Sequence, residues 1–380
     1  MIELDGPIRP YAWGSRTFLA QLQGRDVPSP TPEAELWLGA HPDAPAQAGG
    51  TPLTDVIAAD PRGVLGDEVV AHFGERLPYL LKLLAADAPL SIQVHPDADQ
   101  AREGFARQEP GTVRTYTDPY PKPELLVAIT PFEALCGFRH PDQTADHLAG
   151  LGVPALDPVV AALRDRSAPV AARLRGALTR LLEWPTDERA ALVDGVVATG
   201  EPLAVRLAKQ YPHDIGVVVA LLLNHVRLQP GEAIFMPAGN VHAYLGGAGV
   251  EIMGSSDNVL RAGLTTKHID PAELMRIVRY EVLAEPTFPG TPLGPGLTSW
   301  SPPVSEFRLV RAVPEPGATL TLPGSGPRIV TCVRGRARLR SGSSEREVPT
   351  GRAVFVAAGE PPVEVIGTSP TEVYQASPGR

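Results

Sequence analysis

Proline and glycine occur so often in this chain that long uninterrupted helices and strands are disfavoured. The 380 residues include 42 prolines and 37 glycines. Proline lacks the backbone N–H that the interior of a helix or of a central strand needs, and both residues are typical of turns. We therefore expect many short elements joined by turns. A chain of this length also predicts two or three domains rather than one small core.

The distribution of apolar residues predicts two β-rich regions separated by a helical one. Short apolar runs broken by Pro and Gly fill the first part, as in AELWLGAHPDAPA, and strand-like pieces return after Val226. Between them, Val170, Leu174, Leu178 and Leu181 recur at helical spacing. We expect a mainly β protein with jelly-roll-like β domains. Its expected parts are a discontinuous catalytic domain (1–139 plus 225–302), an α-helical insertion domain (140–224) and a C-terminal β domain (303–380).

Charge and cysteine content exclude several classes of protein. The net charge is −9 and no run of Lys or Arg stands out, so a nucleic-acid partner is not expected. The two cysteines, Cys136 and Cys332, are too few and too far apart for a disulfide framework, which favours a reducing, cytoplasmic setting. The N-terminus lacks the pattern of a signal peptide, and the apolar stretches are too short to span a membrane.

One histidine stands in a pattern that is typical of a metal site in a small barrel. Gly231 follows a proline, the run from Ala233 to Met236 is strand-like, and Pro237 and Gly239 form a second turn before His242. This spacing resembles the second motif of the cupins, whose histidine binds a metal inside the barrel. We therefore take His242 as a candidate ligand.

Two further segments offer donors that can meet at one ion. Gln93 and His95 are two apart in SIQVHPD, so in a strand they face the same side. The cupins that this pattern resembles have a carboxylate close behind such a pair, and two residues here can supply it. Asp99 follows closely but lies at the start of an expected helix with Asp97 as its N-cap. Glu124 lies two residues after Lys122 in a proline-rich segment, DPYPKPELL, whose stiff backbone can turn both side chains into one cavity.

Several motifs together resemble the type I mannose-6-phosphate isomerase family of cupin-fold enzymes. They are YAWGS, SIQVHPD, YPKPELLVAI, PFEALCGFR, PAGNVHAY and VEIMGSSDNVLRAGLTTKHID, in this order from Tyr11 to about Asp270. The resemblance implies one Zn²⁺ per chain and interconversion of D-mannose 6-phosphate and D-fructose 6-phosphate through an enediol(ate), feeding GDP-mannose metabolism. It places the zinc ligands at Gln93, His95, Glu124 and His242. The arginine that the family assigns as catalytic falls on Arg261.

The chemistry of an aldose–ketose isomerase suggests roles for further residues. A base must move a proton between C1 and C2, and a fixed positive charge must stabilise the oxygen that becomes negative. Candidates for the base are Glu251, Lys122 and Asp257, and Arg261 is the candidate cation, at the enediolate or at the phosphate. Lys82 lies in an apolar run and either reaches solvent or points into the cavity. Candidate substrate contacts are Ser91, Lys82, Lys267 and, in the YAWGS motif, Trp13, which can also be core.

Two other functions share parts of this pattern. Two histidines and a carboxylate also describe the iron site of a cupin dioxygenase, and Mn, Fe or Co can replace zinc on such ligands. A sugar-binding cupin without catalysis is the second alternative. The glutamine ligand and the LRAGLT motif argue against the first, and Arg261 with the full ligand set argues against the second. We expect a small phosphosugar as partner, and a monomer, with a weak homo-oligomer as the alternative.

Overall fold

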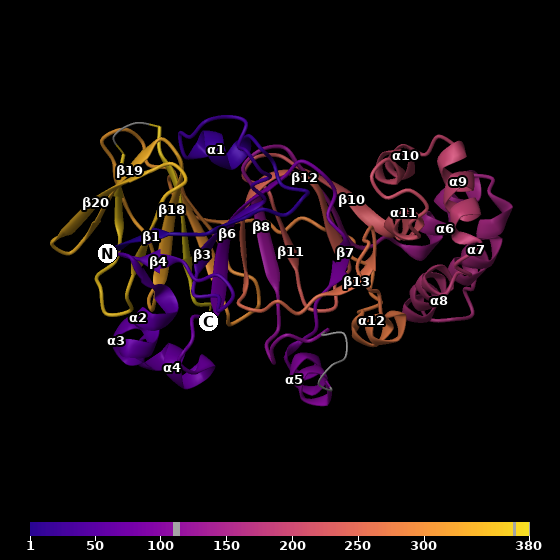
Figure 1. Ribbon diagram of the computed structural model, residues 1–380, viewed down its shortest axis with the longest axis horizontal. Helices are drawn as coiled ribbons and strands as arrows, with labels where there is room; N and C mark the ends of the chain where they lie inside the picture. The colour runs from indigo at the N-terminus through magenta and orange to yellow at the C-terminus, as the bar shows by residue number, and fades with distance from the viewer. Residues whose placement is uncertain (109–114, 368–369, 380) are drawn as a thin grey trace.

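The computed structural model describes residues 1–108, 115–367 and 370–379. Two β regions lie side by side, and a group of helices packs at the end of one of them (Figure 1). Both chain termini lie in the β region far from these helices. The predicted mainly β architecture with an α-helical insertion is confirmed. No helix in the described residues is long and apolar enough to cross a membrane.

The strand β12 (His242–Gly254) is the centre of a ten-stranded sheet. Its first residues pair with β7 and β9, and its later residues pair with β6 and β8. The strand changes partners at a register shift between Tyr244 and Gly246. Gly247 follows with a φ of 112°, and a Cβ there would lie 2.6 Å from the carbonyl oxygen of Pro131, so this bend requires glycine. The other strands of this sheet are β2 (Ile8–Arg9), β3 (Glu35–Gly39), β6 (Tyr79–Ala86), β7 (Ile92–Val94), β8 (Glu124–Ala128), β9 (Phe132–Phe138), β10 (Leu223–Leu228), β11 (Ala233–Met236) and β13 (Leu260–Gly263).

The barrel that the sequence suggested is not closed. Among the described strands, the main path of the sheet runs from β10 through β9, β12, β6 and β3 to β2 and ends on open edges. The branches β11–β8 and β13–β7 attach to it through β12. Because β12 bends between two sets of partners, the strands still enclose a common interior face, and the site described below lies there.

The second β region joins both ends of the chain. β1 pairs with β21, which places Leu4 opposite Ala353. The sheet has the order β14-β15-β16-β23-β18-β21-β1-β4-β5, and a smaller sheet has the order β17-β22-β19-β20. The predicted domain bounds remain a prediction. The strands are β1 (Ile2–Asp5), β4 (Gln47–Ala48), β5 (Thr51–Pro52), β14 (Thr291–Gly294), β15 (Leu297–Trp300), β16 (Arg308–Ala312), β17 (Thr319–Thr321), β18 (Arg328–Arg334), β19 (Arg336–Ser341), β20 (Ser344–Pro349), β21 (Ala353–Val356), β22 (Glu364–Ile366) and β23 (Glu372–Ser377).

The helical group covers the outer face of the strands that carry the site. Ile92 and Val94 of β7 share a core with Leu178 and Leu181 of α8. Side chains alternate along a strand, so Gln93 points away from these helices, toward the interior face. The helices of this group are α6 (Pro141–Gly150), α7 (Asp157–Arg164), α8 (Val170–Leu182), α9 (Arg189–Ala198), α10 (Pro202–Ala208) and α11 (Gly216–Val219), with short 3₁₀ turns η1 (Pro154–Leu156) and η2 (Ala220–Leu222).

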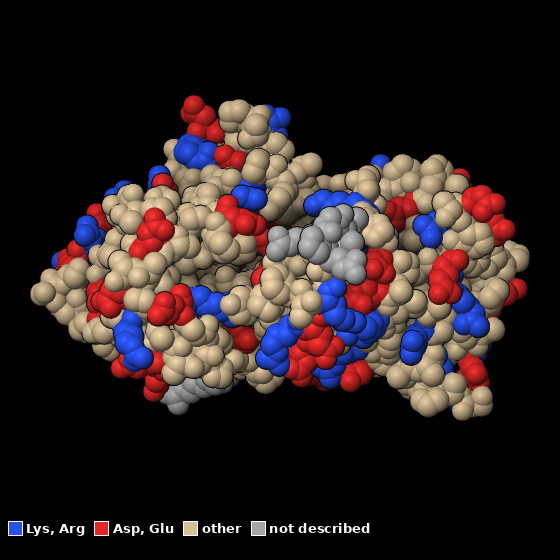
Figure 2. All heavy atoms as spheres, turned by 60° about the horizontal axis from the view of Figure 1, so that its bottom comes forward, with Lys and Arg blue, Asp and Glu red and all other residues tan. Residues whose placement is uncertain are grey.

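The remaining helices lie outside the sheets. Asp97 caps α5 by accepting from the backbone N–H of Gln100, as predicted. The face on which α5 and α12 lie is hollowed at its centre, with basic and acidic side chains beside the hollow (Figure 2). The bounds are α1 (Phe18–Leu22), α2 (Leu53–Ala59), α3 (Pro61–Leu65), α4 (Asp67–Phe73), α5 (Ala98–Arg107) and α12 (Pro271–Ile277).

Candidate active site and metal centre

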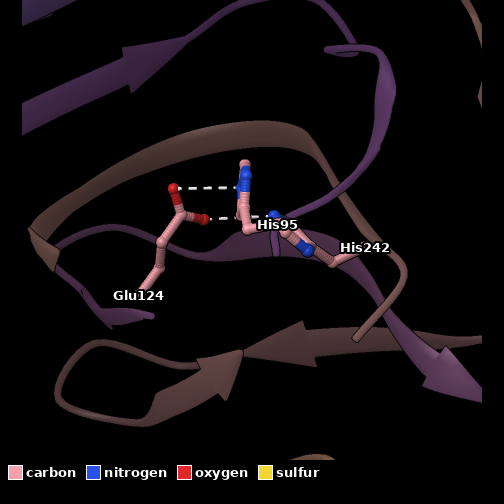
Figure 3. Close-up of side chains that lie close together, drawn as sticks. All are labelled: His95, Glu124 and His242. Atoms are coloured by element: carbon pink, nitrogen blue, oxygen red, sulfur yellow. Dashed lines mark ion pairs between the residues drawn. The ribbon is translucent and has the colours of Figure 1, made fainter. Parts of the chain in front are cut away.

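Three buried side chains converge on the interior face. One ligand atom of each of His95, Glu124 and His242 lies within 4.8 Å of those of the other two. Glu124 Oε1 is 3.4 Å from Nε2 of His95, and Glu124 Oε2 is 3.1 Å from Nε2 of His242. Figure 3 shows the carboxylate facing both rings. His95 follows β7, Glu124 begins β8 and His242 begins β12, so three segments distant in sequence build the cluster.

The hydrogen bonds of the two rings prepare them for a metal ion. Nδ1 of His95 is 2.7 Å from the carbonyl oxygen of Asn258, and Nδ1 of His242 is 3.0 Å from that of Asn240. A carbonyl oxygen only accepts, so each Nδ1 carries the proton and each Nε2 offers a lone pair to the cluster. Burial lowers the pKa of His95 to about 4, which keeps this ring neutral. Nε2 of His95 is buried without a hydrogen-bond partner among the described residues. Two lone pairs opposite a carboxylate fit a bound cation.

Gln93 stands directly beside this cluster. Backbone pairing places Gln93 opposite His242 on one side and opposite Arg261 on the other. Directly opposed residues of neighbouring strands project from the same face, so the three side chains form a row. The amide nitrogen of Gln93 donates to Oγ of Ser91 over 3.0 Å, which leaves the amide oxygen for another partner. That oxygen is the atom through which Gln93 can bind a metal.

Asp99, the other carboxylate considered from the sequence, lies outside the site. Its side chain is exposed and pairs with Arg102 on the surface of α5. Glu124 is therefore the carboxylate that reaches both histidines. Lys122 is buried as well, and its Nζ lies 3.1 Å from Glu124 Oε1.

Lys82 does not reach solvent. It is buried, and its Nζ lies 3.1 Å from Glu251 Oε2 and 3.5 Å from Glu35 Oε1. The hydroxyl of Tyr244 donates to the other oxygen of Glu251 over 2.7 Å. Burial raises the pKa of Glu251, and the charge of Lys82 opposes this rise. The two carboxylates and the ammonium form one buried charged group.

Arg261 and Lys267 form a second basic group. Arg261 is half-buried, and burial lowers its pKa. The positive charge of Arg261 is the main cause that lowers the pKa of Lys267, which places the two cations close together. Within the described part of the chain, neither has an ion-pair partner. Two neighbouring cations without carboxylates are suited to bind an anion.

Asp257 and Trp13 lie at the margins of the site. Asp257 Oδ2 is 3.4 Å from Nε2 of His41, and both residues line a cavity of about 320 Å³ together with Arg76 and Tyr120. The side chain of Asp257 is 34% exposed. Trp13 stacks on Tyr11 with ring centroids 5.7 Å apart and packs against the apolar cluster that contains Tyr244.

The sequence interpretation missed several residues of the site. Glu35, His41 and Tyr244 were not recognised, although each contacts a candidate residue. A signal was present for Glu35, because an acid within the apolar run AELWLGA is unusual and predicts a buried partner. Tyr244 carried a weaker signal, its position two residues after His242.

Known proteins resemble this chain over nearly its whole length. Residues 1–141 match the family model "Phosphomannose isomerase type I, catalytic domain". The mannose-6-phosphate isomerase of Escherichia coli (strain K12) is 38% identical, and the match covers 97% of each chain. Mannose-6-phosphate isomerase 2 of Arabidopsis thaliana is 32% identical over 97% of this chain and 90% of its own.

Solved structures show the same fold over the whole chain. A phosphomannose isomerase variant from Salmonella typhimurium superposes with a TM-score of 0.91 at 34% identity, and the match covers 100% of both chains. A mannose 6-phosphate isomerase bound with zinc and yttrium gives a TM-score of 0.90 at 34% identity, again over 100% of both chains. A zinc-bound form of the enzyme gives 0.87 at 34% identity over 100% of this chain and 99% of that chain. The chain belongs to the mannose-6-phosphate isomerase family.

Proposed function

We propose that this protein interconverts mannose 6-phosphate and fructose 6-phosphate with one zinc ion held by Gln93, His95, Glu124 and His242. The observation that carries the proposal is the buried cluster of two imidazoles and one carboxylate, in the same strand row as Arg261. The relatives named above support the substrate, and the zinc-bound structures support the metal.

The donor set fits zinc. Imidazole nitrogen, carboxylate oxygen and an amide oxygen are ligands that zinc accepts, and a catalytic site keeps a position open for the substrate. When bound, zinc supplies Lewis-acid polarisation of the sugar's carbonyl and hydroxyl oxygens. Asn258 and Asn240 hold the two imidazoles in the required tautomer through their carbonyl oxygens.

The proton between C1 and C2 passes through one of the three candidate bases. Both oxygens of Glu251 are already engaged, by Tyr244 and by Lys82, which makes it an orienting group in this scheme. Lys122 lies beside the metal cluster, and Asp257 lies at the adjacent cavity with one face open to solvent. We assign the transfer to Lys122 or Asp257. Exchange of deuterium from solvent into C2 of the sugar distinguishes them. If Lys122 is the base, Lys122→Met loses this exchange and Asp257→Asn keeps it. If Asp257 is the base, the reverse holds.

The phosphate binds at the other end of the row. Arg261 is two strands away from His242, which corresponds to about 10 Å across a sheet. Arg261 and Lys267 supply two cations that no carboxylate neutralises among the described residues. Ser91 stands beside Gln93 and offers a hydroxyl toward the same row. The open-chain sugar phosphate would then lie along the row, with its carbonyl end at the metal.

We further propose that the protein acts as a cytoplasmic monomer with a free phosphosugar as substrate. Both cysteines are buried and unpaired, which is consistent with a reducing compartment. Sedimentation of the purified protein tests the monomer: a mass of twice 40.3 kDa at micromolar concentration would contradict it.

A coupled assay of fructose 6-phosphate formation from mannose 6-phosphate tests the proposed function. We expect turnover by the zinc-loaded protein and loss of both zinc and activity in Glu124→Gln. Glu133→Gln is the matched control, because Glu133 is a carboxylate on β9 that pairs with Arg206 outside the site. A zinc-loaded wild-type protein without turnover, or a Glu124→Gln protein with full zinc and full activity, would contradict the proposal.

A further inference from the structure

Three neighbouring strands carry a second buried charged group beside the metal cluster. In the sheet, Trp37 of β3 stands opposite Lys82 of β6, and Lys82 stands opposite Glu251 of β12. Glu35, two residues before Trp37, projects from the same face of β3. All four side chains are buried. The group is thus built into the sheet by strand register and does not depend on flexible surface residues.

The same register places this group next to the metal site. β8 pairs with β12 so that Glu124 stands opposite Met253 and Leu126 stands opposite Glu251. Met253 and Glu251 are two apart and face the same side, so Glu124 and Glu251 are diagonal neighbours on the interior face. The negative charge of Glu124 is among the causes that raise the pKa of Lys82, so the charged group and the metal cluster interact electrostatically.

The ammonium of Lys82 has one donor to spare. An ammonium carries three N–H donors. Within the described residues, two carboxylates lie at contact distance, Glu251 at 3.1 Å and Glu35 at 3.5 Å. The ring of Trp37 lies 5.3 Å from Nζ and closes another side. The remaining N–H is available to a group that enters the site.

Glu35 is itself held rigidly. Its second oxygen, Oε2, accepts from the indole N–H of Trp37 over 2.7 Å. Burial alone would lower the pKa of Lys82, but Glu251 and then Glu35 outweigh it and raise the pKa. Lys82 therefore stays charged at neutral pH and is a fixed donor, not a base. Burying three charges together is costly, and such a group is retained where a charge must be kept in one place.

We propose that Glu35 is a positioning residue of the isomerase: with Trp37 and Glu251 it holds the ammonium of Lys82 beside the metal cluster, where its remaining N–H donates to the substrate oxygen on which negative charge develops. This inference rests on the proposed function. Glu35 itself touches neither the metal cluster nor the substrate, and acts only through Lys82.

The pH profile of a Glu35→Gln variant tests the inference. Glutamine keeps the size of the side chain and can still accept from Trp37, but it removes one of the two nearest negative charges from Lys82. Among the described residues, the other charged or titratable groups around Lys82 and Glu35 include Glu251, Glu124, His41 and Arg9. We expect kcat to fall by about tenfold or more with little change in KM. We also expect activity at alkaline pH to be lost at a lower pH in the variant than in the wild-type protein, because removing a nearby negative charge lowers the pKa of Lys82.

Controls separate this role from a merely structural one. Glu33→Gln removes a carboxylate two residues earlier that pairs with Arg25 away from Lys82, and it should leave the pH profile unchanged. Glu35→Asp keeps the charge and should restore most of the activity at alkaline pH. Zinc content is measured in every variant and should stay at one per chain.

Each outcome decides the matter. A folded, zinc-loaded Glu35→Gln protein with the wild-type kcat and pH profile would overturn the inference. If Glu35→Gln does not fold, Trp37→Phe takes its place, because it removes the indole donor to Glu35 and keeps a smaller aromatic ring beside Lys82. A wild-type kcat in that variant would overturn the inference. Absence of turnover in the wild-type protein would instead refute the proposed function, and the two failures are therefore distinguishable.

Discussion

Replacing Arg261 by methionine tests how the site binds the phosphate. Methionine keeps an unbranched side chain but removes the guanidinium. Arg261 is half-buried, lies close to Lys267 and has no ion-pair partner among the described residues. If these two cations hold the phosphate, the variant loses charged hydrogen bonds to a substrate group that does not react.

The size of the effect follows from that geometry. A hydrogen bond to a charged group contributes about 1.5–3 kcal/mol. Because about 1.4 kcal/mol corresponds to a factor of ten, Arg261→Met should lower kcat/KM by about 10- to 150-fold. Most of the loss should appear in KM, since the phosphate contact is the same in the ground state and in the transition state.

Competition by inorganic phosphate is the decisive assay. The inhibition constant of phosphate should rise in Arg261→Met by a factor similar to the loss in kcat/KM, at fixed ionic strength because salt screens such contacts. Arg180→Met, which removes an exposed arginine of the helical insertion, is the control and should change neither quantity. An unchanged inhibition constant together with a lower kcat would show that Arg261 acts at the reacting carbons, and would refute the phosphate assignment.

Two further predictions concern buried groups. Lys82→Met leaves Glu251 and Glu35 buried without their cation, and should lower the free energy of unfolding by about 3–5 kcal/mol, measured by urea unfolding. Burial raises the pKa of Glu251 and the charge of Lys82 opposes this rise, so removing Lys82 should raise that pKa further. Between the two pKa values the folded variant holds a proton that the folded wild-type protein has released. The loss should therefore grow as pH rises above the pKa of Glu251 in the wild-type protein, and a loss that shrinks with pH would contradict this. Burial also raises the pKa of Cys136 to about 12 and that of Cys332 to about 11. Neither thiol should react with a disulfide reagent at pH 8 before the chain unfolds, and rapid labelling of the native protein would count against the described core.

The features that could be predicted from the sequence are those that depend on residues close to one another in the chain. Helical spacing from Val170 to Leu181 predicted α8, and Asp97 predicted a capped helix start, because both depend on residues within a few positions of one another. The alternation of Gln93 and His95 likewise predicted two donors on one face of a strand, and backbone pairing gives Gln93 the neighbour His242.

The features that could not be predicted depend on which distant strands pair. Nothing in the segment Ile2–Asp5 indicates that it joins the sheet of the C-terminal strands, where Leu4 lies opposite Ala353. The environment of Lys82 was undecided for the same reason. Its partners Glu35 and Glu251 come from strands far away in sequence, and only the order β3-β6-β12 brings them together. The jelly-roll barrel was expected from strand and turn spacing and from the resemblance to cupins, neither of which reveals that β12 changes partners at its bend.

Titration of the metal-free protein with zinc tests the central claim most directly. Bound zinc per chain and the initial rate of fructose 6-phosphate formation from mannose 6-phosphate are measured on the same samples. The cluster of His95, Glu124 and His242 predicts a rate that rises in proportion to bound zinc and levels off at about one zinc per chain. Full activity without zinc, or no activity with one zinc bound per chain, would contradict the assignment of this protein as a zinc-dependent mannose-6-phosphate isomerase.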